Sequence, residues 1–187
     1  MPVYIFAILI AGWVAWCTPF VLAAGKRPSS RADALDRRAR WGVILQALSY
    51  ALIWQGLKPM EPPVWRIALS VLFLAAASAF SWSGTRALGR QWRVDAGLNA
   101  DHELVRSGPY AIVRHPIYAS MLFLLLGTGF MVATWLMFAI SLAIFIVGTE
   151  IRTRVEDALL ETRFGDEFRG YRRSVPAYIP FVRASTN

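Results

Sequence analysis

The segment "GPYAIVRHPIYAS" places several chemically active side chains at the edge of a long apolar run. It holds Arg114, His115 and Pro116 in a row, with Tyr110 and Tyr118 on either side. Pro116 suits the first position of a helix, where its missing N–H is not needed, and this puts His115 at or near the N-cap. Backbone N–H groups and the positive end of the helix dipole can bind a carboxylate or phosphate there. The same residues could instead anchor a helix end among lipid headgroups, so this segment alone leaves both interpretations open.

A second candidate pair follows the apolar run. Arg152 and Glu156 are four residues apart, so they share a face if the helix continues. They could form an exposed ion pair worth a few tenths of a kcal/mol, or face inward as a fixed cation beside a fixed anion. Farther on, Phe164, Phe168 and Tyr171 form a stripe typical of an amphipathic segment that lies on a membrane or closes over the core.

The composition indicates what must position these residues. Of the 187 residues, 56% are hydrophobic and eight are Trp, which is too apolar for an ordinary soluble domain and predicts an integral membrane protein. The net charge of +8 raises the possibility of nucleic-acid binding. However, the basic residues lie in blocks between apolar runs, as membrane-flanking charges do, so we expect no nucleic-acid partner. The lone cysteine, Cys17, provides no metal site, and we expect no bound metal.

The apolar runs predict an all-α membrane bundle. Residues 3–24, 41–57 and 64–82 each read as one transmembrane helix. Residues 117–149 carry no charge, but a single helix of that length would be about 50 Å long, which exceeds the bilayer thickness. We therefore expect two helices joined near residues 127–134 as a hairpin. This gives five transmembrane helices in a single membrane domain, 1–187, followed by a C-terminal helix.

The basic residues also predict the orientation. Residues 25–40 hold six Lys or Arg, residues 83–115 hold five and residues 150–187 hold seven. With five spans these three segments fall on one side, which the positive-inside rule makes cytoplasmic. The N-terminus is then outside and the C-terminus cytoplasmic.

The ordered motifs resemble a known family. "DHELVRSGPYAIVRHPIYAS" followed by "RTRVEDALLETRFGDEFRGYRRSVPAYIP" is similar to the isoprenylcysteine carboxyl methyltransferases, which are integral membrane enzymes that use S-adenosylmethionine. The resemblance covers about residues 88–180, and five spans match the compact prokaryotic members. It implies a cofactor-binding and catalytic part over residues 83–187 and a three-helix scaffold over residues 1–82. Asp157 departs from the family pattern, where a second Glu is usual, and Phe168 stands where a Tyr is common.

The resemblance also implies roles for individual residues. Arg152 matches the arginine assigned to the substrate, and we expect it to be catalytic and substrate-binding. The positions that match the family's cofactor-contacting residues are His102, Glu103, Leu104, Val105, Tyr110, His115, Pro116, Ile117, Tyr118 and Glu156. The implied partners are the bilayer and a lipophilic acceptor that could be an isoprenylcysteine-like carboxylate. Methyl transfer to a carboxylate needs alignment of the reacting atoms and no general base.

Three alternatives stay open. The acceptor could be a phospholipid, another amine or a small thiol. An NADPH-dependent membrane reductase has a related C-terminal pattern, and the many Arg residues could hold the phosphates of its cofactor. A non-enzymatic protein whose basic loops bind anionic lipid would bind neither cofactor and would tolerate His115→Ala.

Overall fold

The computed structural model describes residues 2–24, 34–35, 38–55, 61–89, 97–98 and 103–180. Its helices are α1 (Val3–Ala24), α2 (Ala39–Ile53), α3 (Val64–Leu88), the 3₁₀-helix η2 (Gly108–Ala111), α4 (Pro116–Val132), α5 (Trp135–Phe164) and α6 (Asp166–Ser174). A two-residue strand β1 (Ala34–Leu35) pairs antiparallel with β2 (Gly97–Leu98). Apart from this short pairing, all secondary structure of the described residues is helical, as predicted.

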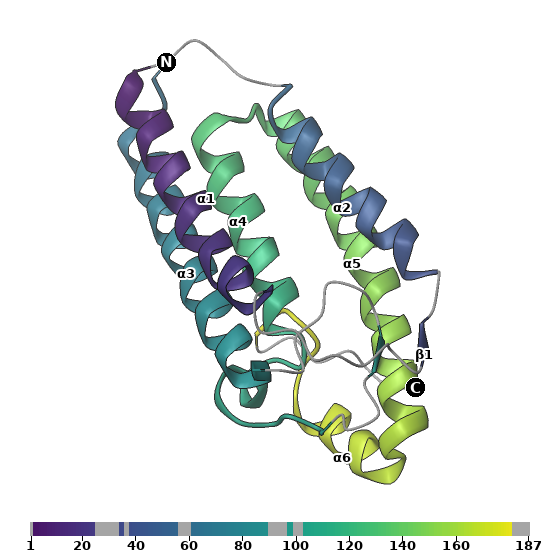
Figure 1. The fold of residues 1–187 in the computed structure, drawn as a ribbon. Helices are drawn as coiled ribbons and strands as arrows, with labels where there is room; N and C mark the ends of the chain where they lie inside the picture. Colours follow the sequence, from purple (N-terminus) through teal and green to yellow (C-terminus); the bar gives the residue numbers. More distant parts are fainter. Residues whose placement is uncertain are drawn as a thin grey trace.

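The five long helices form two packed groups. α3 packs against both α1 and α4, whereas α2 packs along α5. Figure 1 shows the two groups side by side, with α4 and α5 joined at one end and diverging toward the other. The predicted break in the uncharged run falls at Ala133 and Thr134, inside the expected interval. The prediction of a hairpin is not confirmed, because the main packing partner of α4 is α3 and that of α5 is α2.

Arg66 stabilises the joint between α4 and α5. Its guanidinium Nε donates to the Phe130 carbonyl oxygen at 2.7 Å, and its Nη2 donates to the carbonyl oxygens of Gly129 at 3.1 Å and Ala133 at 2.6 Å. These carbonyls lie at the C-terminal end of α4, where the last carbonyl groups of a helix lack intrahelical donors in general, although the Gly129 oxygen also accepts from the Ala133 N–H at 3.0 Å. The guanidinium carbon also lies 5.1 Å from the centre of the Trp135 ring. Arg66 therefore has a structural role at this helix end.

Three of the helices are long and apolar enough to cross a membrane, namely α1, α3 and α5. α2 and α4 are shorter apolar helices of 15 and 17 residues. Large apolar side chains such as Val14, Ile44, Leu72 and Val147 are exposed on the outer faces, which suits contact with lipid. Five crossings remain a prediction.

α5 runs well past the apolar segment. It continues for 15 residues beyond Thr149 and carries Arg152, Glu156 and Asp157 before it ends at Phe164. Gly165, with a φ of +52°, then turns the chain into α6. The predicted apolar stripe closes over the core in part, since Phe168 is fully buried and Tyr171 is nearly so.

Candidate active site

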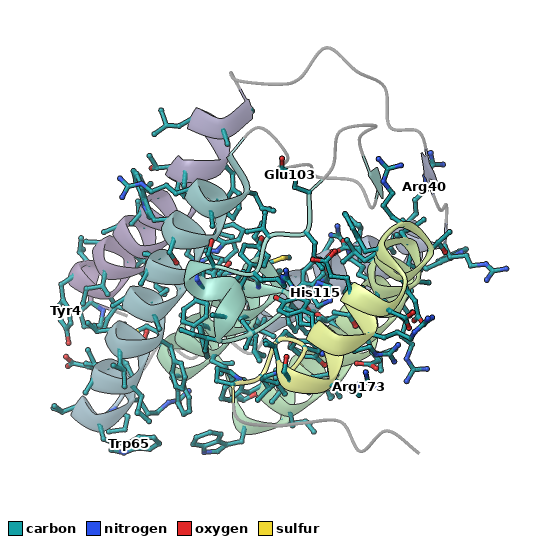
Figure 2. The ribbon with its side chains drawn as sticks, turned by 90° about the horizontal axis from the view of Figure 1, so that it is seen from below. Tyr4, Arg40, Trp65, Glu103, His115 and Arg173 are labelled. Atoms are coloured by element: carbon teal, nitrogen blue, oxygen red, sulfur yellow. The ribbon has the colours of Figure 1, made fainter. Side chains whose placement is uncertain are left out.

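The start of α4 is fastened to the segment that follows α6. The backbone N–H groups of Arg114 and His115 donate to the carbonyl oxygens of Pro176 and Ala177, both at 2.8 Å. His115 is the N-cap of α4 and Pro116 its first residue, as the sequence predicts. His115 is buried beneath this contact. Figure 2 shows it in the interior, near the C-terminal part of α5.

His115 joins two carboxylates of α5. Its Nδ1 lies 3.4 Å from Glu156 Oε2, and its Nε2 lies 2.9 Å from Asp157 Oδ1. Burial alone would lower the pKa of His115, but the hydrogen bonds and negative charges of Asp157 and Glu156 outweigh it and raise the pKa from 6.5 to about 9. The imidazole is therefore protonated at neutral pH, with both ring N–H groups donating to carboxylates.

Glu156 has further partners on its other side. The hydroxyl of Tyr118, in the first turn of α4, donates to Glu156 Oε1. Arg152 Nη2 lies 3.8 Å from the same oxygen, and its guanidinium carbon lies 4.9 Å from the centre of the Tyr118 ring. Arg152 is 8% exposed. The pair predicted from the i, i+4 spacing thus faces inward.

Asp157 is held from a second direction by Arg114. The Arg114 Nη2 donates to Asp157 Oδ2 at 2.9 Å, and both side chains are 9% exposed. Arg172 of α6 approaches the same oxygen, with its Nε 3.9 Å away. A carboxylate in this position is satisfied by two buried cations, so Asp157 acts mainly as an organiser of the cluster. By contrast, the Glu156 side chain is 26% exposed and keeps surface for a ligand.

The predicted site residues divide into two groups. The structure brings together His115, Tyr118, Arg152 and Glu156, with Pro116 and Ile117 in the first turn of α4 beside them. Tyr110 is buried, and its carbonyl oxygen accepts from the Tyr171 hydroxyl at 2.6 Å, so it ties η2 to α6. Leu104 and Val105 are half-buried, whereas Glu103 is exposed and points away from His115 in Figure 2. His102 lies outside the described residues.

Four residues of the cluster are not among the predicted site residues, namely Gln46, Arg114, Asp157 and Arg172. Asp157 was visible only as a departure from the family pattern, although it contacts both His115 and Arg114. Gln46, in the expected scaffold, is 2% exposed and its Oε1 accepts from Arg152 Nη1 at 3.4 Å. A buried amide within an apolar helix is the signal that could have identified it, because such a group needs a partner.

The raised pKa of His115 predicts a pH dependence of stability. Its protonated form contributes fully below about pH 6.5, the pKa in the unfolded chain, and the contribution is lost as the pH rises through about 9. We expect the thermal unfolding midpoint in detergent to fall between pH 7 and pH 10. The fall should be smaller in His115→Gln, which has no charge to lose. An identical slope in both proteins would contradict the assignment.

The chain is similar to known membrane proteins over much of this region. The family described as Phospholipid methyltransferase matches residues 65–167, more than half of the chain, from the start of α3 into α6. The chain belongs to this family. The match contains the whole charged cluster except Gln46 and Arg172, so the residues that meet at α4 and α5 lie in the part that defines the membership.

Several curated proteins are similar to this chain, and their names differ. Protein-S-isoprenylcysteine O-methyltransferase of Schizosaccharomyces pombe is 38% identical over 87 residues, which are 45% of this chain and 36% of the relative. Cobalt-zinc-cadmium resistance protein CzcN of Cupriavidus metallidurans is 31% identical over 137 residues, 63% of this chain and 62% of the relative. Methanethiol S-methyltransferase of Pseudomonas deceptionensis is 35% identical over 74 residues, 40% of this chain and 27% of the relative.

These matches confirm the resemblance to isoprenylcysteine carboxyl methyltransferases. The chain nevertheless spans only about a third to two thirds of the length of the first relatives. In the described part of the chain, no three His, Cys, Asp or Glu side chains are grouped so that they could hold a metal ion.

Proposed function

We propose that this chain is an S-adenosylmethionine-dependent methyltransferase that acts at the membrane surface on a lipophilic acceptor. The observation that carries the proposal is the buried cluster at α4 and α5 of a chain that belongs to a methyltransferase family. In this cluster His115 and Tyr118 hold Glu156, and Arg152 lies 3.8 Å from the same carboxylate.

The residues present fit this cofactor. S-adenosylmethionine bears an ammonium, a sulfonium, a carboxylate and ribose hydroxyls. Glu156 is a partly exposed anion whose charge suits the ammonium or a ribose hydroxyl, and the first turn of α4 supplies backbone N–H groups suited to the carboxylate. His115 would act by fixing Glu156. When bound, the cofactor supplies an electrophilic methyl group.

The cluster is suited to aligning the reacting groups rather than to removing a proton from the acceptor. His115 is protonated and donates through both nitrogens, so it does not serve as a general base. An acceptor that is already anionic, such as a carboxylate or a thiolate, needs no base. Arg152 would hold it by paired N–H bonds in the orientation that the displacement requires.

The position of the cluster favours the predicted topology. In Figure 1 the start of α4, the end of α5 and α6 lie at one end of the ribbon. The described helix ends that adjoin the basic segments 25–40 and 83–115 in sequence, namely the end of α1, the start of α2 and the end of α3, point toward that same side. Of the described residues at the opposite end, only Arg66 is cationic. A cytoplasmic location would let a water-soluble cofactor enter from the cytosol and a lipid-like acceptor from the bilayer.

The acceptor class can be tested with the purified full chain in nanodiscs. Labelled S-adenosylmethionine is supplied with a farnesylated N-acetylcysteine, a short alkyl thiol or phosphatidylethanolamine, and methylated products are identified by mass spectrometry. We expect transfer to the farnesylated carboxylate or the thiol rather than to the amine. An exclusive amine product would contradict the alignment argument, and absence of transfer to all three would count against the proposal.

Arg152→Ala should lower turnover and have little effect on the affinity for the cofactor. We expect kcat/KM for the acceptor to fall by about ten-fold, because a charge-assisted hydrogen bond to an anionic acceptor is lost. The Kd for S-adenosylmethionine should change by less than about three-fold, since the cofactor's anion, Glu156, remains. Arg152→Lys should rescue only in part, because a point charge cannot replace the guanidinium fork. Arg154→Ala, on the same helix and 79% exposed, is the matched control. Equal losses of cofactor and acceptor affinity would refute the division of roles.

A further inference from the structure

The strongest feature outside the predicted site is the contact between α2 and Arg152. α2 is an apolar helix, yet Gln46 is buried in its middle at 2% exposure. An amide in such surroundings is costly unless both of its ends are paired. Its Nε2 donates to Thr149 Oγ1 at 2.9 Å, and its Oε1 accepts from Arg152 Nη1 at 3.4 Å. The Gln46 amide therefore forms hydrogen bonds to two successive turns of α5.

The backbones of α2 and α5 approach each other closely at this contact. A Cβ built on Gly42 would overlap the Arg152 side chain and lie 2.5 Å from the Gly148 carbonyl oxygen. A Cβ on Gly148 would lie 2.8 Å from the Gly42 carbonyl oxygen. The stem of Arg152 thus runs directly over the backbone of α2, where no side chain stands in its way. Gly42 and Gly148 permit the close approach of α2 and α5, and Gln46 holds the guanidinium of Arg152 by a hydrogen bond.

Two further described residues, Tyr118 and Glu156, lie beside the Arg152 guanidinium. The guanidinium carbon lies over the Tyr118 ring of α4, 4.9 Å from its centre, and Glu156 lies one turn farther along α5. Arg152 Nη2 lies 3.8 Å from Glu156 Oε1, beyond hydrogen-bonding distance, while Arg152 Nη1 donates to Gln46 Oε1. That carboxylate is the anion proposed to meet the cofactor. Gln46 keeps the cation and the anion as two separate binding groups.

We infer that Gln46 is a positioning residue that orients Arg152 toward the methyl acceptor. The inference rests on the proposed role of Arg152. It also assigns a functional contribution to α2, which the sequence had indicated to be scaffold.

The first test is a chemical one that does not depend on methyl transfer. Phenylglyoxal modifies accessible guanidinium groups, and the modified positions are mapped by mass spectrometry in the full chain in nanodiscs. We expect Gln46→Leu to raise the modification of Arg152 several-fold over the wild type, because the guanidinium loses a fixed partner. Modification of the exposed Arg154 should not change and serves as the internal reference. Gln46→Glu keeps an oxygen acceptor and should leave Arg152 shielded.

The second test separates positioning from general destabilisation. Gln46→Leu should lower kcat/KM for the acceptor by about ten-fold and leave the Kd for S-adenosylmethionine within two-fold of wild type. In an Arg152→Ala background, Gln46→Leu should have no further effect. Ser70→Ala is the matched control, since it removes another fully buried interhelical hydrogen bond, from Ser70 Oγ to the Gly127 carbonyl oxygen at 2.7 Å, far from Arg152.

The outcomes are distinguishable. Unchanged Arg152 modification in Gln46→Leu would overturn the inference, as would parallel losses of cofactor and acceptor affinity or an equal effect of Ser70→Ala. If the wild type neither binds S-adenosylmethionine nor transfers a methyl group, the proposed function fails. The modification pattern would then still decide whether Gln46 orients Arg152.

Discussion

Asp157→Ala should destabilise the protein by about 3–5 kcal/mol, because it leaves two buried cations without their shared anion. Asp157 accepts from His115 Nε2 and from Arg114 Nη2, both at 2.9 Å, and all three side chains are at least nine-tenths buried. Arg114 also fastens the start of α4 to the end of α6, since its Nη1 donates to the Arg172 and Val175 carbonyl oxygens. Loss of Asp157 should therefore loosen the junction of α4, α5 and α6 together.

The loss can be measured as the unfolding free energy in mixed micelles by denaturant titration. Asp166→Ala is the matched control, because Asp166 is 95% exposed and pairs only with exposed Arg169 among the described residues. It should change the unfolding free energy little. Asp157→Asn keeps the shape and removes the charge, and it should fall between the wild type and Asp157→Ala. If Asp157→Ala were as stable as Asp166→Ala, the charged cluster would not hold the junction together.

Glu156→Ala should weaken S-adenosylmethionine binding by about ten- to a hundred-fold, which corresponds to the roughly 1.5–3 kcal/mol of a charged hydrogen bond. Glu156 is the cluster carboxylate with surface left for a ligand, at 26% exposure against 9% for Asp157. The Tyr118 hydroxyl and the His115 imidazolium hold it in place, so little ordering remains to be done on binding.

The effect is measured by calorimetric titration of the cofactor. Glu150→Ala provides the matched control, because Glu150 forms an exposed i, i+4 pair with Arg154 on the same helix and should leave the Kd unchanged. Glu156→Gln tests whether the charge matters beyond the shape, and we expect an intermediate Kd. Equal cofactor affinity in Glu156→Ala and Glu150→Ala would remove Glu156 from the binding site.

The helices could be predicted from the sequence because apolar run length dominates their formation. The first span is predicted at its observed bounds, 3–24, and the predicted joint of the long uncharged run, 127–134, contains the observed break at Ala133 and Thr134. The ends were less exact where polar segments continue a helix. α3 extends six residues past the predicted end at 82, and α5 continues through charged residues to Phe164. Charge marks the end of a lipid-facing segment and does not terminate a helix.

The arrangement of the helices was harder to predict. The hairpin is expected because the uncharged run 117–149 is too long for one membrane-spanning helix, and this says nothing about which helices pack together. Here α5 instead takes α2 as its neighbour, because Gly42 and Gly148 allow their backbones to approach closely. Two isolated glycines about a hundred positions apart give no periodic signal from which this pairing could be read.

For the candidate site too, local features could be predicted from the sequence, whereas contacts between helices could not. Local spacing correctly predicted that Arg152 and Glu156 share a face and that His115 precedes the first turn of a helix. The partners that define their chemistry come from distant positions, such as Gln46 for Arg152 and Asp157 for His115. Motif spacing along the chain cannot indicate such contacts, since they depend on how the helices pack.

The cofactor of this chain can be identified by titrating the purified full chain in nanodiscs with S-adenosylmethionine. We expect saturable binding with a Kd in the micromolar range, on the order of −7 to −8 kcal/mol, and no binding of NADPH. Absence of saturable S-adenosylmethionine binding in a well-folded sample, or binding of NADPH in its place, would contradict the methyltransferase assignment.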